Sequence, residues 1–149
     1  MIEIANLYKT FDKMQVLNGL SLTVRPGETK VIIGRSGAGK SVLLKSIVGI
    51  LRPDSGSIKI DGAEVTNISE PEYDKYRKHI GLVFQGGALF DSLSVGENVS
   101  FVLDEFARPG AAERRERVAY ALSLVGLKGI ENMMPAQLSG GMRKRVSLA

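Results

Sequence analysis

The stretch Gly34-Arg35-Ser36-Gly37-Ala38-Gly39-Lys40-Ser41 fits the pattern G-x-x-x-x-G-K-[ST] at every fixed position. An apolar run precedes it, and the spacing predicts a buried strand over 29–33 and a helix that starts near Lys40. Glycines in such a loop let successive backbone N–H groups point at a phosphate, and the helix N-terminus adds the positive end of its dipole. The stretch therefore predicts a phosphate-binding loop.

Two side chains of this loop carry the expected chemistry. Lys40 supplies a positive charge for the β- and γ-phosphates of a nucleotide, and the Ser41 hydroxyl supplies a ligand for Mg²⁺. The competing interpretation is a glycine-rich turn with a chance lysine, but the fixed positions coincide by chance in about 1% of chains of this length. Nucleotide binding is thus the prediction, and the candidate residues are Gly34, Arg35, Ser36, Gly37, Ala38, Gly39, Lys40, Ser41 and Val42.

The chain changes from strand-rich to helical along its length. In residues 20–24 apolar and polar side chains alternate, which is typical of a half-buried strand, and residues 80–84 predict a fully buried one. The apolar stripe Leu44, Ile47, Val48 and Leu51 predicts a helix that ends before Pro53. Further expected elements are a strand over 2–7, a hairpin over 57–61 and 63–65, and helices over 72–78, 95–103, 111–125 and 140–149. In the helix over 111–125 the expected buried stripe is Val118, Ala121, Leu122 and Val125. This order predicts an α/β core followed by a helical subdomain.

Composition excludes several classes of protein. The chain has 149 residues, no cysteine and one histidine, His79, so a disulfide scaffold, a cysteine-based metal site and a thiol nucleophile are excluded. No apolar run reaches the length of a membrane-spanning helix, and the N-terminus does not resemble a signal peptide. These features predict a cytoplasmic chain.

Positive charge is concentrated in the last part of the chain. Residues 108–149 contain eight basic and three acidic side chains, which raises nucleic acid or an anionic surface as a partner. However, Arg114, Arg115 and Arg117 alternate with Glu113 and Glu116, and no aromatic residues lie among them. A solvated helix face is the better interpretation, so no nucleic acid partner is expected.

Four further motifs lie at informative distances from the phosphate loop. They are Phe11, Pro53-Asp54-Ser55-Gly56 before the expected hairpin, Val83-Phe84-Gln85-Gly86-Gly87, and Leu138-Ser139-Gly140-Gly141-Met142. Together with the phosphate loop, they resemble the nucleotide-binding domain of an ABC transporter ATPase. The segments 84–93 and 138–145 further resemble the ATPase subunits of lipid-trafficking transporters of the MCE or Mla type.

The resemblance implies a role for each motif. Phe11 corresponds to the aromatic residue that stacks on adenine, and Tyr8 is a competing candidate three residues earlier. Gln85 corresponds to the glutamine that ligates Mg²⁺ and senses the γ-phosphate, so Lys40 and Gln85 are the expected catalytic residues and Ser41 and Gln85 the metal ligands. Ser139, Gly140 and Gly141 correspond to the signature that contacts ATP bound to the opposite subunit, although Ser139 could also be a plain helix cap.

The resemblance also implies partners and cofactors. The cofactors are ATP and Mg²⁺, and the expected partners are a second ATPase subunit, bound through the phosphate loop and the signature, and a transmembrane permease, bound near Gly86–Glu97. Such a protein lies on the cytoplasmic face of a membrane. Ala88, Leu89, Phe90 and Leu93 are the apolar residues of the docking segment, and packing beneath the helical subdomain is the alternative for them.

The expected fold class is α/β, a P-loop NTPase core with an N-terminal antiparallel β piece and a helical subdomain, incomplete at the C-terminus. The ATP-binding core is expected over 1–93 and the helical subdomain over 94–149. In the family, a strand that ends in Asp-Glu follows the signature helix, and no such pair follows residue 141 here. The alternatives to a transport ATPase are a nucleotide-binding fragment without turnover and an ABC ATPase that does not serve transport.

Overall fold

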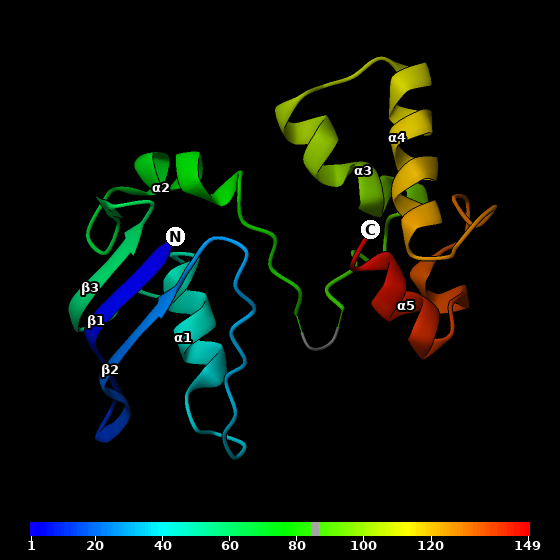
Figure 1. Ribbon diagram of the computed structural model, residues 1–149. Coiled ribbons are helices and arrows are strands. Elements are labelled where there is room, and N and C mark those ends of the chain that lie inside the picture. The colour runs from blue at the N-terminus through cyan, green and yellow to red at the C-terminus, as the bar shows by residue number, and fades with distance from the viewer. Residues whose placement is uncertain (85–86) are drawn as a thin grey trace. The chain divides into compact units, whose positions relative to one another are not determined.

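The computed structural model describes residues 1–84 and 87–149, so the predicted role of Gln85, and Gly86 of the docking segment, lie outside the described residues. The chain forms two compact units, Met1–Leu82 and Val83–Ala149 (Figure 1). The division expected from the sequence, after residue 93, concerns the subdomains of the complete family fold and stays a prediction.

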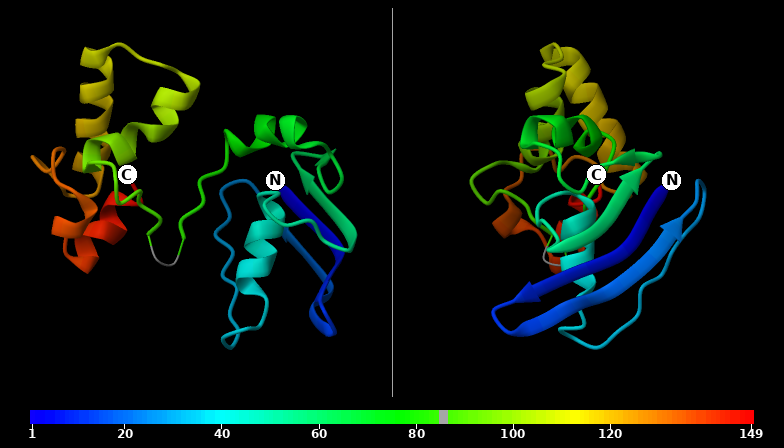
Figure 2. Two further views of the ribbon diagram at one scale, coloured as in Figure 1. Left: turned by 180° about the vertical axis from the view of Figure 1, so that it is seen from behind. Right: turned by 90° about the vertical axis from the view of Figure 1, so that its left-hand side faces the viewer.

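An antiparallel sheet forms the frame of the first unit. Its strands are β1 (Ile2–Phe11), β2 (Met14–Val24), β3 (Ser55–Ile60) and β4 (Ala63–Glu64), in the order β2-β1-β3-β4. The long β1–β2 hairpin dominates this sheet (Figure 2). The alternation predicted for 20–24 is present, because Ser21 and Thr23 are exposed while Leu20 and Leu22 pack against the core. The antiparallel β piece and the α/β class are therefore confirmed.

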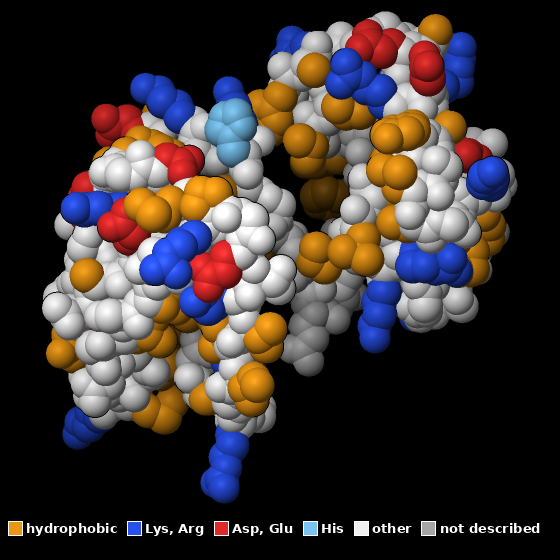
Figure 3. All heavy atoms as spheres, in the orientation of Figure 1, with side chains coloured by type: hydrophobic (Ala, Val, Ile, Leu, Met, Phe, Trp, Pro, Cys, Tyr) orange, Lys and Arg blue, Asp and Glu red, His pale blue; other side chains and the backbone are white. Residues whose placement is uncertain are grey.

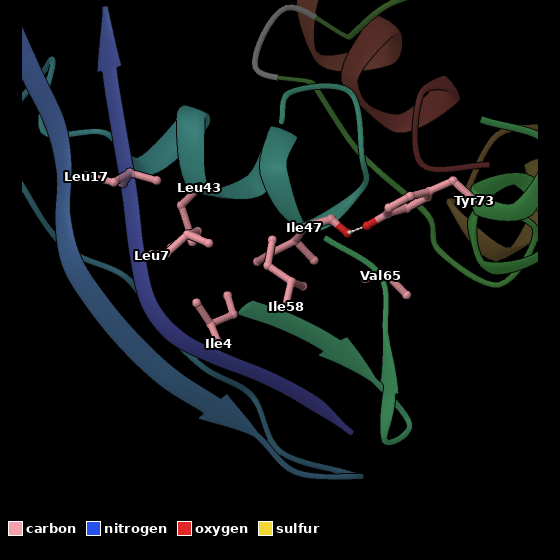
Figure 4. Close-up of a cluster of buried hydrophobic side chains, with 8 residues drawn as sticks. All are labelled: Ile4, Leu7, Leu17, Leu43, Ile47, Ile58, Val65 and Tyr73. Atoms are coloured by element: carbon pink, nitrogen blue, oxygen red, sulfur yellow. Dashed lines mark hydrogen bonds between the residues drawn. The ribbon is translucent and has the colours of Figure 1, made fainter. Parts of the chain in front are cut away.

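The core of the first unit lies between this sheet and helix α1 (Lys40–Ile47). Leu43 and Ile47 point from α1 toward Leu7 of β1 and Ile58 of β3 (Figure 4). Helix α2 (Glu70–Arg77) contributes Tyr73, whose hydroxyl donates a hydrogen bond of 2.7 Å to the Ile47 carbonyl. Burying these apolar side chains fixes α1, and with it the preceding glycine-rich loop, against the sheet.

The apolar stripe predicted for α1 is partly wrong. Leu43, Ser46 and Ile47 form the buried face, whereas Leu44 is 45% exposed. The helix also ends well before Pro53, because Gly49 adopts a φ of 70° and its N–H bonds to the Ser46 carbonyl. Leu51 therefore lies beyond the helix, and of the predicted stripe only Ile47 and Val48 are buried.

The two buried strands predicted at 29–33 and 80–84 are not formed. Val31 is 72% exposed, Ile33 91% and Val83 52%, and none of the three belongs to the sheet. A parallel central strand needs hydrogen-bonding neighbours on both sides, and no strand pairs with either segment in the described parts of the chain. Hydrophobic side chains consequently reach the surface (Figure 3).

The second unit is helical, as predicted. It contains α3 (Val95–Phe106), α4 (Ala111–Leu124), the 3₁₀ turn η1 (Pro135–Gln137) and α5 (Gly140–Val146). The stripe on α4 is confirmed, because Val118 and Leu122 are buried and pack with Val95 of α3. A polar contact adds to this packing: Arg114 of α4 donates to the hydroxyl of the buried Ser100 on α3 at 2.6 Å.

Candidate nucleotide-binding site

The glycine-rich loop 34–39 joins the extended segment after β2 to helix α1. Gly37 and Gly39 have φ values of 79° and 86°, a region that side chains other than glycine rarely adopt. The Ala38 N–H bonds to the Arg35 carbonyl at 3.2 Å, which closes a tight turn within the loop. Gly39 is buried, and it leads directly into the first turn of α1.

Lys40 folds back over this loop. Its ammonium donates to the carbonyls of Gly34 and Arg35 at 2.7 and 2.8 Å. These two bonds hold a positive charge at the mouth of the loop and engage two of the three donors of the ammonium. Ser41 follows on α1 and is exposed. The geometry thus places a cation and a hydroxyl at one helix N-terminus.

The N-terminus of α1 differs from those of α2 and α3. Each of those helices begins with a capping box, in which Glu72 or Glu97 occupies the third position and bonds back to the cap. Helix α1 has Gly39 as its cap, no side-chain cap bond and no acidic residue in its first turn. Its positive dipole end is therefore not neutralised by the chain, which fits an anionic ligand such as a phosphate.

We expect Gly39→Ala to lower the free energy of unfolding by more than Gly37→Ala. A Cβ on Gly39 would lie 2.9 Å from the Val16 carbonyl oxygen, whereas a Cβ on Gly37 would meet nothing within 4 Å. Both substitutions incur about 1–2 kcal/mol for a positive φ, so Gly37→Ala is the matched control and the difference reports the contact. Denaturant titration measures both values, and equal losses would contradict a tight packing of the loop against β2.

Phe11 stands at the end of β1 and is 40% exposed. Tyr8, the competing aromatic, is half-buried, and its hydroxyl lies 2.9 Å from the position of a Cβ on Gly19. Phe11 pairs with Met14 in the hairpin, two residues before Val16, whose carbonyl abuts Gly39. The structure therefore brings Phe11 and the glycine-rich loop to the same part of the first unit, and it leaves the Phe11 ring accessible.

The signature residues begin helix α5 in the second unit. Ser139 is the N-cap, and its hydroxyl accepts a hydrogen bond of 3.2 Å from the Met142 N–H. Gly140 and Gly141 are exposed, and a Cβ on either would meet nothing within 4 Å. The capping role considered for Ser139 is therefore present, and the adjacent backbone is open to an approaching ligand.

The described part of the docking segment has two kinds of apolar residue. Leu89 packs against the core of the second unit, as the alternative interpretation expects for it. Phe90 is 49% exposed, and its ring lies 4.7 Å from that of Phe101 on α3, centroid to centroid. Asn98, which the sequence did not single out, accepts from the Phe90 N–H at 2.7 Å and donates to its carbonyl at 3.1 Å. In the sequence, the role of Asn98 is indicated only by its position four residues after Ser94, the N-cap of α3.

The described residues contain neither a helix that could span a membrane nor a cluster of side chains that could hold a metal ion. None of the helices in the described ranges is long and apolar enough to cross a membrane. Among the same residues, no group of three or more histidine or acidic side chains is arranged to hold a metal ion. For Mg²⁺ the described chain offers the Ser41 hydroxyl beside the phosphate loop, which suits a cation held jointly with phosphate oxygens.

The fold and this loop define a nucleotide-binding cassette. The family of ABC transporter proteins matches residues 17–149, and the chain belongs to that family. The match includes the glycine-rich loop and the signature and begins after Phe11.

Three curated relatives show how far the likeness extends. The chain is 48% identical over 150 residues to the protein TRIGALACTOSYLDIACYLGLYCEROL 3, chloroplastic, of Arabidopsis thaliana, with 100% of this chain and 43% of the relative covered. It is 44% identical over 148 residues to the probable ribonucleotide transport ATP-binding protein mkl of Mycobacterium tuberculosis, covering 99% and 41%. It is 42% identical over 149 residues to the methionine import ATP-binding protein MetN of Brucella abortus, covering 100% and 40%. The chain thus spans about two fifths of these relatives.

Two solved structures of ATP-binding cassettes have the same fold as this chain. The ATP-binding cassette MJ0796, a dimer in a post-hydrolysis state bound to ADP and Pi, superposes with a TM-score of 0.92 at 33% identity, covering 99% of this chain and 67% of that one. The cassette cbiO1 of Clostridium perfringens, part of the transporter complex cbiONQ, gives a TM-score of 0.83 at 33% identity, covering 98% and 58%.

Proposed function

We propose that this chain binds ATP with Mg²⁺ and that, in the whole protein, ATP hydrolysis drives an ABC transporter. The observation that carries the proposal is the N-terminus of α1, which has a glycine cap, no acidic residue and the Lys40 ammonium above the loop. The structure of MJ0796 with ADP and Pi supports a nucleotide as the anion. Calorimetric titration with Mg–ATP tests the proposal, and no binding at millimolar ATP would contradict it.

We propose a role for each residue from the family to which the chain belongs. The loop amides and Lys40 bind the β- and γ-phosphates, and Phe11 stacks on adenine. Ser41 and Gln85 ligate Mg²⁺, which neutralises charge on the phosphates when it is bound. Residues 1–93 form the ATP-binding core and residues 94–149 the helical subdomain.

A lipid is the substrate that we propose for the transporter. The name of the Arabidopsis relative contains a galactolipid, and that relative is 48% identical to this chain. The mycobacterial relative, at 44%, carries a name that refers to ribonucleotides, so a phosphorylated solute is the competing cargo. We further propose that the protein lies on the cytoplasmic face of the membrane, where ATP is present and a permease can be reached.

We propose a homodimer in which Ser139, Gly140 and Gly141 contact the γ-phosphate held by the partner's loop, an arrangement supported by the dimeric state of MJ0796. In the full-length protein, Ser139→Ala should leave the ATP affinity of the monomer unchanged. It should weaken ATP-driven dimerisation by roughly 10- to 150-fold, because it removes a hydrogen bond to a charged group.

The matched control for Ser139→Ala is Ser94→Ala, because Ser94 caps α3 in the same way. Both variants lose a helix cap, worth about 1 kcal/mol, but only one alters the signature. Analytical ultracentrifugation with ATP measures dimerisation. If both variants dimerised equally poorly, Ser139 would act only as a cap.

We propose that the permease docks near Gly86–Glu97, where the exposed Phe90 packs against the ring of Phe101. Phe90→Asp should weaken permease binding by at least about tenfold, as loss of a central aromatic does at protein interfaces. Leu124→Asp is the control, because Leu124 is 68% exposed on α4 and lies outside the segment. Co-purification with the permease measures the effect, and equal retention of both variants would place the docking surface elsewhere.

A further inference from the structure

The side chain of Asp54, which lies just before β3, holds the last residues of β1. Strand β3 pairs with β1 only as far as Tyr8, opposite Ser55, and the register of β1 with β2 shifts on both sides of Lys9. The Thr10 N–H therefore has no strand partner on the β3 side. It donates instead to a carboxylate oxygen of Asp54, the residue before β3, at 2.6 Å.

The same carboxylate binds Lys9. The Lys9 ammonium donates to the other carboxylate oxygen of Asp54 at 2.7 Å, and the Asp54 N–H continues the ladder with a bond of 2.9 Å to the Tyr8 carbonyl. The Lys9 side chain is only 16% exposed, which is low for a lysine. The pKa of the Asp54 carboxyl lies below its ordinary value, first because of the bond from Lys9 and then because of the bond from Thr10. Asp54 thus fixes two consecutive residues immediately before Phe11.

Lys9 also contacts the Phe11 ring. Its ammonium lies 5.6 Å from the ring centroid, within the range of a cation–π contact. Residues two apart in a strand share a face, so Lys9 and Phe11 are neighbours on one side of β1. Lys9 is therefore held by Asp54 and in turn lies against Phe11, a residue that is 40% exposed.

We propose that Lys9 and Asp54 are positioning residues that hold Phe11 as the stacking platform for the base of the bound nucleotide. The proposal rests on the ATP binding proposed above. It is supported by the hairpin geometry, since Lys9 pairs with Leu17, next to the Val16 carbonyl that abuts Gly39 of the phosphate loop. A fixed ring orientation reduces the ordering cost of stacking, because Phe11 does not have to be immobilised by the base.

The test compares Mg–ATP with Mg–tripolyphosphate, which carries the phosphates but no base, in calorimetric titrations of the full-length protein. Phe11→Ala should weaken ATP binding by about fivefold or more, the scale of a lost base–aromatic stack, and leave tripolyphosphate binding unchanged. Asp54→Asn and Lys9→Met should each reproduce part of this selective loss. In a double-mutant cycle, Asp54→Asn should cause little further loss in the Phe11→Ala background, because both changes act through the same ring.

Glu28→Gln is the matched control. Glu28 is also a carboxylate that accepts from a backbone N–H, that of Arg25 at 2.8 Å, and pairs with a lysine, Lys30, at 2.5 Å. Its substitution should change neither affinity.

Three results would overturn the inference. Asp54→Asn and Lys9→Met could lower the affinities for ATP and for tripolyphosphate equally, or they could leave the ATP affinity unchanged. The third is that their losses of ATP affinity add fully to the loss caused by Phe11→Ala. If the unaltered protein bound neither ligand, the proposed ATP binding would fail as well. If it bound both and only Phe11→Ala acted on ATP, ATP binding would stand and the positioning role alone would be wrong.

Discussion

Lys40→Ala should weaken ATP binding by roughly 10- to 150-fold, because it removes a charge-assisted hydrogen bond worth about 1.5–3 kcal/mol. The ammonium is already held above the loop by the Gly34 and Arg35 carbonyls, so little side-chain entropy is lost when it meets a phosphate. Lys40 bonds to the first two residues of the loop, whereas the positive φ values of Gly37 and Gly39 are allowed by glycine itself. Binding should therefore fall while the fold persists.

Isothermal titration calorimetry with Mg–ATP measures this effect, and circular dichroism checks the fold. Lys45→Ala is the matched control, since Lys45 is an exposed lysine in the last turn of the same helix. It should leave the dissociation constant unchanged. If Lys40→Ala and the unaltered chain had the same dissociation constant for ATP, the prediction that this loop binds phosphate would be wrong.

The 149-residue chain by itself should hydrolyse ATP only at the background rate. No acidic residue follows Glu131, so the chain has no Asp-Glu pair after its signature, where the family places its general base. A positioned general base is worth about 10²–10⁴ in rate, and a missing Mg²⁺-ordering carboxylate lowers the rate further. ATP should still bind through Lys40 and Ser41, because neither residue depends on the missing carboxylates.

Phosphate release by the purified chain, with Lys40→Ala as the blank, measures this rate. Turnover that required Mg²⁺ and disappeared in Lys40→Ala would contradict the prediction, because the loop would then support hydrolysis without the missing Asp-Glu pair. Equal phosphate release from the chain and from the blank is the expected result.

Local sequence was sufficient wherever a short segment determines its own structure. Gly37 and Gly39 adopt the positive φ values that the motif requires, and Ser139 caps α5 because a hydroxyl can accept from the first turn of its own helix. The alternation in 20–24 and the stripe with Val118 and Leu122 likewise predicted the buried faces of β2 and α4. The family was predicted from such motifs, and the match to residues 17–149 confirms it.

Periodicity was insufficient where a segment depends on neighbours. Residues 29–33 and 80–84 have the apolar content of buried strands, but a strand exists only when another strand supplies its hydrogen bonds. In the same way, the face of α1 was misjudged because contact with β1 and the Gly49 turn, rather than the stripe, determine that Leu43 is buried and Leu44 exposed.

The sequence by itself determined the glycine-rich loop and the cap of α5, because these rest on backbone sterics and on hydrogen bonds between residues only a few positions apart. Only the tertiary structure decided which aromatic residue is accessible and what holds it. Tyr8 lies against Gly19 across the hairpin, and Phe11 follows residues bound by Asp54, more than forty positions along the chain. Such contacts arise when strands pair, and no local pattern in the sequence encodes them.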